Sequence, residues 1–486
     1  MEHDKSHYRL GVVLAAGGNL LGMVASLGTI MVAARMLSKD DLGAFFLVMV
    51  VVQFVVLLSD LGLKNTSIKT LSSIPVGSTE FLQATHYLLT ITLCASFLAG
   101  CICWAAMPLL KSLWPYESFR AQLMYAIPIA FLTALFQIMT SILVGGKQFK
   151  RLSAWSAGIE VLRATISAGC LVAGFGVSSL FWGMIISRLV GISAVWASMP
   201  SWFALSFRYQ GRSDLFKFGG WLYGGSLVSA CMVRCSDAIL TTYLGPAALA
   251  VYSAAMQIPT VMQRVFEATR PALLGYVAAH HGSYEHQQIE AARILTAVLS
   301  IASTMCIALA DPLMTLLYST QYESGVVIMQ ALSVWMLFAI LNYFYSVILI
   351  GKGQPRRAFL LTIPQFFIML IAAQLLVSQY HGFGGALALV ITAFLGNLIG
   401  AKLIAGEDRA MWSALVMNMI RAAGPVVLFF VLVLQVKLSV FLHVGLSVGA
   451  LAGLGLLKVV TVSDIHAVRE LVSQIAGRLS ARPTTV

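Results

Sequence analysis

The amino-acid sequence predicts an all-α polytopic membrane protein of about fourteen transmembrane helices, in which two six-helix bundles repeat in parallel orientation before two C-terminal helices. Three observations predict this fold class. Of the 486 residues, 59% are hydrophobic and 10% are charged, whereas soluble proteins carry about 25% charged residues. The hydrophobic residues recur in runs of about 18 to 25, a length that crosses a bilayer as a helix. The chain also repeats itself after about 206 residues.

Charged residues, glycines and prolines bound these runs and set the ends of the predicted spans. No connecting segment before the C-terminal tail exceeds about 20 residues, too few for a soluble domain of about 50 residues or more. We therefore expect a function carried out within the membrane, without enzyme activity, cofactor or metal. The predicted spans are 11–36, 42–63, 82–108, 121–145, 153–174, 177–199, 218–244, 247–270, 290–311, 326–350, 358–378, 385–405, 415–435 and 441–461.

Basic residues are distributed unevenly between the two sets of loops. An even number of spans puts both termini on one side, and the loops of that side carry most of the Lys and Arg residues. The positive-inside rule then predicts cytoplasmic termini in a multi-pass protein of the bacterial cytoplasmic (inner) membrane. Contact of these loops with anionic lipid explains the net charge of +12 without nucleic acid. The opposite loops carry only Arg35, Lys39, Lys111, Arg120 and Lys437.

Four short matches at helix junctions define the internal repeat. Because the offset spans six helices, the two halves have the same orientation and are related by an axis along the membrane normal. This predicts bundles at 1–210 and 211–405, with 406–486 holding two further helices and a cytoplasmic tail. A cleft between the bundles would suit alternating access. The matches pair 37–45 with 244–252, 116–118 with 322–324, 145–151 with 351–357, and 174–176 with 382–384.

Several charged residues fall inside predicted spans, where each costs about 2.5 to 3.5 kcal/mol on insertion scales. Arg234 and Asp237 are three residues apart and can pair on one helix face. Two interpretations stay open. The pair locks its helix to a neighbour, or Arg234 binds phosphate in a cavity while Asp237 gates it or couples transport to a proton or Na⁺.

Further charges lie on other spans. Arg188 has no carboxylate three or four residues away, so it needs a partner on another helix or an anionic ligand. Glu160 and Arg163 can pair with each other, which favours a structural role. Arg264 and Arg270, with Glu267 between them at helical spacing, either contact lipid headgroups or form a cationic entrance that captures diphosphate. Asp60 occupies the repeat position of Glu267, which favours a scaffold role for both.

At the motif level the chain resembles the polysaccharide or lipid-linked oligosaccharide flippases, in the larger multidrug/oligosaccharidyl-lipid/polysaccharide exporter superfamily. The resemblance covers roughly 10–405 and implies a V-shaped, two-bundle exporter fold. By position it also implies that Arg35, with Arg264 or Arg270, and Asp40 or Asp41 line the cavity. The second span lacks an evident Arg, so that part of a diphosphate site is not implied. The motifs are ARMLSKDDLG at 34–43, SDLGL at 59–63, SDAIL at 236–240, LGP at 244–246, VYSAA at 251–255 and LLYSTQY at 316–322.

The function that the resemblance implies is movement of a polyprenyl-diphosphate-linked oligosaccharide from the cytoplasmic to the periplasmic leaflet, for exopolysaccharide, O-antigen or capsule synthesis. The expected partners are this lipid, membrane lipid and a polysaccharide polymerase or export protein. The cationic bias of the intramembrane charges favours an anionic cargo. A cation-coupled multidrug antiporter of the same fold is the alternative and should have a net acidic cavity. A membrane-embedded polymerase or ligase would need a longer periplasmic loop than this chain has.

Overall fold

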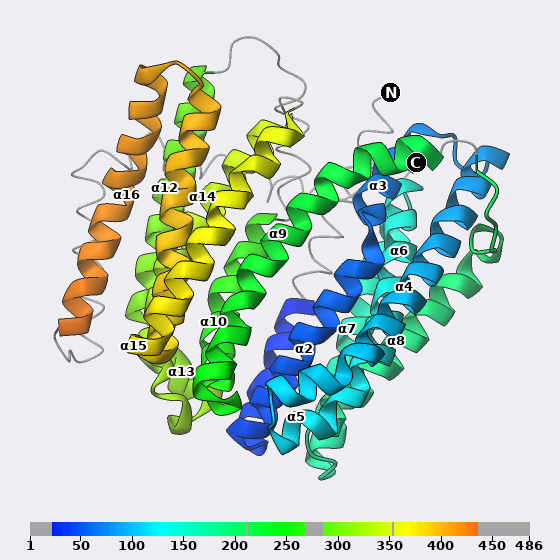
Figure 1. Cartoon of the computed structure of the whole chain (residues 1–486), viewed down its shortest axis with the longest axis horizontal. Coiled ribbons are helices and arrows are strands. Elements are labelled where there is room, and N and C mark those ends of the chain that lie inside the picture. Colours follow the sequence, from blue (N-terminus) through cyan, green and yellow to red (C-terminus); the bar gives the residue numbers. More distant parts are fainter. Residues whose placement is uncertain (1–21, 210–211, 268–284, 352–353, 436–486) are drawn as a thin grey trace, which may run out of the picture.

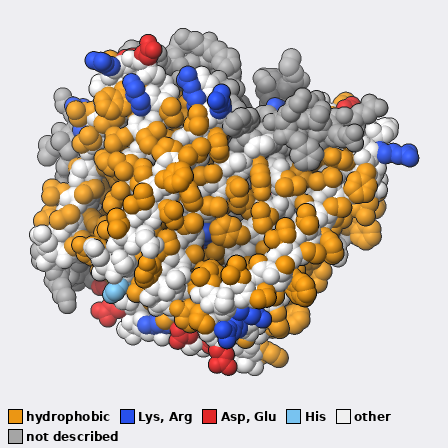
Figure 2. All heavy atoms as spheres, viewed as in Figure 1, with side chains coloured by type: hydrophobic (Ala, Val, Ile, Leu, Met, Phe, Trp, Pro, Cys, Tyr) orange, Lys and Arg blue, Asp and Glu red, His pale blue; other side chains and the backbone are white. Residues whose placement is uncertain are grey.

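The computed structural model of the chain describes residues 22–209, 212–267, 285–351 and 354–435. Within these ranges every regular element is helical. Eight of the described helices are long and apolar enough to cross a membrane, or nine if a bent pair counts as one span. Figure 2 shows hydrophobic side chains over the middle of one face and charged side chains gathered towards its upper and lower ends. The protein is therefore a multi-pass membrane protein.

Every predicted span that falls in the described residues coincides with a helix. The span at 441–461, residues 11–21 of the first span and residues 268–270 of the span at 247–270 lie outside the described residues. The helices are Gly22–Met36 and then α2 Lys39–Asp60, α3 Leu63–Ser73, α4 Thr79–Leu113, α5 Glu117–Gln122, α6 Ala126–Gly145, α7 Phe149–Val172, α8 Ser178–Ser198, α9 Arg212–Leu244, α10 Pro246–Glu267, α12 Glu285–Ala308, α13 Ala310–Tyr318, α14 Gly325–Gly351, α15 Pro355–Ala405 and α16 Arg409–Gln435.

Three features differ from the predicted spans. Helix α3 was not predicted, because its residues are too polar for a membrane span. Helices α12 and α13 are bent by 60° relative to each other. The two spans predicted at 358–378 and 385–405 run together as α15, with a kink at His381 where φ is 55° and ψ is −135°. All three differences concern how spans join.

The internal repeat is visible in the helix boundaries. Helices α2 and α10 are both 22 residues long, and their first and last residues lie 207 positions apart. Helix α6 ends at Gly145 and α14 at Gly351, the predicted equivalent glycines. Helices α7 and α8 together correspond to α15. The kink of α15 at His381 precedes the Gly-Phe-Gly segment at 382–384, which is the repeat equivalent of the Gly-Phe-Gly segment at 174–176 in the α7–α8 turn. Equivalent sequence positions therefore begin and end equivalent helices.

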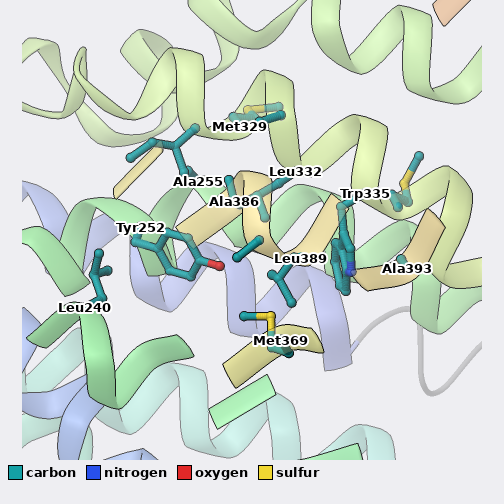
Figure 3. Close-up of a cluster of buried hydrophobic side chains, with 14 of the residues drawn as sticks. Leu240, Tyr252, Ala255, Met329, Leu332, Trp335, Met369, Ala386, Leu389 and Ala393 are labelled. Atoms are coloured by element: carbon teal, nitrogen blue, oxygen red, sulfur yellow. The ribbon is translucent and has the colours of Figure 1, made fainter. Parts of the chain in front are cut away.

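Helices pack mainly within each half of the chain. Helix α7 packs on α8 and α4 on α6, while α15 packs on α9 and α14, and α12 on α16. Figure 1 shows these two groups leaning apart, with α2, α9 and α10 between them. Helix α2 packs directly on α10, its repeat equivalent, and contacts α9. The core of the second group is shown in Figure 3, where Tyr252, Leu332 and Leu389 lie among buried apolar neighbours.

Candidate functional site

A cavity of about 870 Å³ lies where the two groups of helices meet. Its wall takes side chains from both halves of the chain, from Phe45 on α2 to Trp335 on α14. Along α2 the lining residues run from Phe45 to Asp60, a length of about 22 Å at 1.5 Å per residue. A second cavity of about 400 Å³ adjoins it and shares Ser26, Lys64, Gln137, Glu160, Arg188 and Arg264 with the first.

Basic side chains outnumber acidic ones in the larger cavity. Of the described residues, five Lys or Arg and three Asp or Glu line it, so these residues have a formal net charge of +2. We call this space the cationic cavity. Its charged lining residues are Lys64, Arg163, Arg188, Arg234, Arg264, Asp60, Glu160 and Asp237.

The turn between α2 and α3 brings Lys64 to this cavity. Helix α2 ends at Asp60, and the next two residues, Leu61 and Gly62, have positive φ values of 46° and 77°. Glycine adopts such positive φ values without a steric penalty because it has no Cβ atom, which explains why Gly62 suits this turn. The Asp60 carboxylate then accepts a hydrogen bond from the backbone N–H of Lys64 at 2.9 Å and stabilises the start of α3. Asp60 therefore has the scaffold contact expected of it, and it also lines the cavity.

Three charged residues form a cluster on α7 and α8. Glu160 accepts hydrogen bonds from Arg163 Nε at 2.8 Å and from Arg188 Nη2 at 3.1 Å. The predicted Glu160–Arg163 pair is confirmed, and Glu160 is the partner from another helix that Arg188 required. The Arg188 guanidinium carbon also lies 4.9 Å from the centre of the Phe136 ring, a cation–π contact. One carboxylate serves two guanidiniums, so the cluster keeps a net positive charge.

A second ion pair lies on α9. Arg234 Nη1 donates to Asp237 Oδ2 at 2.7 Å, as predicted from their spacing. Arg234 Nε also donates to Gln53 Oε1 of α2 at 2.6 Å. This bond joins the two halves of the chain across the cavity. Both open interpretations of the pair are therefore compatible with its geometry, because it contacts a neighbouring helix and lines the cavity.

Arg264 lies near the end of α10 and lines both the cationic cavity and the adjoining one. Within the described residues it makes no ion pair. Arg270, its predicted companion, lies outside the described residues. Four of the predicted site residues thus lie around one cavity: Arg188, Arg234, Arg264 and Asp237.

Three of the residues implied by the resemblance, Arg35, Asp40 and Asp41, lie elsewhere. Arg35, Asp40 and Asp41 are not among the residues that line the described cavities. The Arg35 guanidinium donates to the carbonyl oxygen of Leu316, on the other half of the chain. Asp41 accepts from the Ser38 hydroxyl at 2.8 Å, while its N–H donates to the same hydroxyl at 3.1 Å, so it belongs to the N-terminal cap of α2. Binding or gating by these three residues stays a prediction.

Arg35 takes part in a group of contacts that joins the two halves at the end of the molecule where α2 begins. Trp114 Nε1 donates to Thr242 Oγ1 at 3.0 Å, and the Tyr116 hydroxyl donates to the Thr241 carbonyl at 3.1 Å. At Gly43 on α2, an added Cβ atom would overlap with the carbonyl oxygen of Pro246 on α10. Only glycine permits this approach. The cavity therefore ends at a tight contact of the two halves.

Sequence reasoning missed two residues of the site. Lys64 follows the predicted span 42–63 and was therefore expected in a loop. Nothing in the sequence reveals that the α2–α3 turn places its side chain at the cavity. Gln53 carried a signal that was not used: it is the single polar side chain in the run 42–58, which is otherwise apolar. An isolated amide within a membrane span needs a polar partner, and here that partner is Arg234.

The model of the family described as "Polysaccharide biosynthesis protein" matches residues 32–327. The chain belongs to this family. The match includes every motif on which the family resemblance was based, so that resemblance is confirmed. The cationic cavity of this polysaccharide biosynthesis protein is built largely from the matched residues.

One relative within curated proteins is the succinoglycan biosynthesis transport protein ExoT of Rhizobium meliloti (strain 1021). It is 22% identical over 311 residues, which are 60% of this chain and 59% of the relative. The match thus spans less than two thirds of the relative's length.

Solved structures share the fold over most of the chain. The lipid II flippase MurJ in an inward closed conformation has a TM-score of 0.73 at 12% identity, with 90% of this chain and 97% of that chain covered. An inward-facing multidrug resistance MATE family transporter of the MOP superfamily has a TM-score of 0.65 at 16% identity, covering 82% of this chain and 96% of that chain. These likenesses confirm the two-bundle exporter fold of this polysaccharide biosynthesis protein.

Proposed function

We propose that the protein is a flippase that moves a polyprenyl-diphosphate-linked oligosaccharide from the cytoplasmic to the periplasmic leaflet by alternating access. The observation that carries this proposal is a cavity between the halves with five basic and three acidic side chains at its wall. Basic residues at membrane depth cost several kcal/mol in total unless they meet a counter-charge. Lys64 and Arg264 have no ion-pair partner within the described residues, and an anionic headgroup would supply one.

The chemistry of a diphosphate suits this set of side chains. Guanidinium groups donate paired hydrogen bonds to phosphate oxygens, and a Lys ammonium adds a compact charge. Lys64, Arg188 and Arg264 line both adjoining cavities, so a ligand there would be met by all three. The sugars would occupy the cavity, and the polyprenyl tail would remain among lipid acyl chains.

The hydrogen bonds of Arg35, Trp114 and Tyr116 to the other half support a state that is closed at the end where α2 begins, next to the basic-poor loops. At the opposite end, towards which Lys64 and Arg264 lie, α9 packs on α3 across the two halves, so in this proposal these two helices part to admit the headgroup. In the proposed cycle the headgroup enters from the cytoplasm, and the contacts at Arg35, Gly43 and Trp114 separate before it leaves. The cytoplasmic termini, the inner-membrane location, the domain division at 210 and 405 and any polymerase partner belong to the same proposal.

The alternative function is cation-coupled export of small organic molecules, which is favoured by the likeness to the MATE transporter fold. Asp237, buried on the cavity wall, would then be the coupling carboxylate. The net positive charge of the cavity disfavours an organic cation as cargo. Export of ethidium that depends on Asp237 would favour this alternative.

Binding of undecaprenyl diphosphate to the purified protein in nanodiscs tests the proposal. The wild type should bind this lipid at least tenfold more tightly than undecaprenyl monophosphate, since a second phosphate adds charge and acceptors. Arg188→Gln and Lys64→Gln should each weaken diphosphate binding about tenfold, the loss of about 1.4 kcal/mol from a charge-assisted bond. Arg120→Gln is the control, because Arg120 lies outside the cavity and donates to the Lys111 carbonyl. Equal affinities for both lipids would contradict the proposal.

A further inference from the structure

The second half of the chain contains a cavity of its own, about 360 Å³ in volume. It joins the cationic cavity, because Ser226, Val233, Gln263 and Trp335 line both. Its size falls within the range of about 300 to 1,000 Å³ typical of small-molecule sites. Among the described residues that line it, none carries a charge. We call it the neutral cavity.

The neutral cavity is the repeat equivalent of the charged cavity that adjoins the cationic one in the first half. Eight lining positions of each correspond at an offset of 206 residues. The charges differ between the two: Glu160 and Arg188 line the first-half cavity, whereas the second-half cavity has amides, hydroxyls and aromatic rings. One scaffold thus offers two sites of different chemistry. The paired positions are Met23 and Ser229, Ser26 and Met232, Phe136 and Asn342, Gln137 and Tyr343, Thr140 and Ser346, Val144 and Ile350, Leu152 and Ala358, and Ser156 and Thr362.

Two amides in the neutral cavity have unused hydrogen-bonding capacity. Asn342 Nδ2 donates to Gln365 Oε1 at 2.8 Å. Asn342 Oδ1 and Gln365 Nε2 are buried and lack a hydrogen-bond partner among the described residues, and Gln365 is only 2% exposed. Buried polar atoms are rarely left unpaired. The pair thus offers one acceptor and one donor, which a hydroxyl group can satisfy together because it both donates and accepts.

The surroundings hold these groups in place. An added Cβ atom at Gly396 would lie 2.6 Å from Gln365 Cδ, so the amide is seated against the glycine backbone. Trp335 is 5% exposed and lies beside Leu389 and Ala393 in Figure 3, two further residues of the same wall. Its ring is therefore fixed by the apolar core. Aromatic rings with a few fixed polar groups form the usual wall of a specific small-molecule site.

We propose that the neutral cavity binds the sugar of the lipid-linked substrate, with uncharged hexose rings against its aromatic wall and their hydroxyls on Asn342 and Gln365. This inference rests on the proposed flippase function and adds to it that the diphosphate and the sugars bind in different cavities. The diphosphate lies at the charged side in the first half of the chain, and the sugars extend into the second half. Sugar selectivity then resides in α14 and α15, whereas affinity for the diphosphate resides in α3, α8 and α10.

The test compares two lipids on one set of variants in nanodiscs. The probes are undecaprenyl diphosphate and a panel of undecaprenyl diphosphates that carry glucose, galactose or N-acetylglucosamine. At least one glycosylated lipid should bind at least tenfold more tightly than the sugar-free lipid. The double variant Asn342→Leu/Gln365→Leu should remove that gain and leave the affinity for undecaprenyl diphosphate within twofold. Replacing both amides leaves no orphaned partner, so the fold should be retained.

Gln374→Leu is the matched control, an amide on the same helix that donates to the Tyr243 hydroxyl and lies outside the described cavities. It should keep the sugar-dependent gain. Equal loss of affinity for both lipids in the double variant, or no gain from any sugar, would overturn the sugar site. If undecaprenyl diphosphate fails to bind but the double variant still abolishes binding of a glycosylated lipid, the diphosphate proposal fails and the sugar site stands.

Discussion

The charged residues within the membrane are of two kinds: those whose ion-pair partner lies three residues away on the same helix, and those whose partner lies on another helix. Glu160 with Arg163 and Arg234 with Asp237 are three residues apart, and helical spacing alone predicted both pairs. The partner of Arg188 is 28 residues away on another helix. The sequence could show that Arg188 needed a partner, but only the packing of α7 on α8 identifies it. Lys64 escaped prediction for the same reason, because a turn rather than a spacing places it.

Glu160→Gln tests the balance of charge in the α7–α8 cluster. The change leaves Arg163 and Arg188 without their shared carboxylate, and these side chains are only 12% and 17% exposed. We expect the free energy of unfolding to fall by about 1–3 kcal/mol, less than for a fully buried ion pair, because the three side chains are partly exposed. The formal charge of the cavity rises by one, so undecaprenyl diphosphate should bind more tightly.

Thermal unfolding and lipid binding measured on the same sample check both parts of this expectation. Glu117→Gln, at an exposed position outside the cavity, is the control and should change neither quantity. A Glu160→Gln protein with weaker diphosphate binding would indicate that the carboxylate holds Arg188 in its binding position.

At the scale of elements, the boundaries of spans were predictable and their junctions were not. Hydrophobic runs predict the positions of the helices, and the sequence repeat relates α2 to α10. The polar helix α3, the 60° bend between α12 and α13 and the continuity of α15 through His381 depend on turn geometry and packing. These junctions matter for the site, since the α2–α3 turn contributes Lys64.

The close packing of α2 on α10 at Gly43 predicts that a larger side chain at this position would separate the two halves of the chain. Gly43→Ala would place a methyl group against the Pro246 carbonyl, so the two helices must separate and the present conformation must lose stability. Nitroxide labels at positions 117 and 323, on opposite halves, should report longer distances in this variant, and transport should fall at least tenfold. In the control Gly158→Ala, where a Cβ meets nothing within 4 Å, distances should stay as in the wild type. Unchanged distances in Gly43→Ala would mean that this contact does not hold the halves together.

At the scale of the whole molecule, the uneven distribution of basic residues predicts the orientation in the membrane. A single cysteine at position 117 should react with an impermeant maleimide in spheroplasts. One at position 409 should react only after the membrane is permeabilised. The labels are placed in a chain whose seven native cysteines are replaced. The reverse pattern would put the cationic cavity towards the periplasm and reverse the proposed direction of transport.

The central claim is that the charged wall between the two halves carries a diphosphate headgroup across the membrane. Its most direct test is translocation of a fluorescent undecaprenyl-diphosphate-linked glycan in proteoliposomes, scored by the fraction that becomes accessible to a quencher. The wild type and Arg120→Gln should move the lipid at equal rates, whereas Lys64→Gln/Arg188→Gln should reduce the rate at least tenfold while inserting normally. Translocation by the double variant at the wild-type rate would contradict the account.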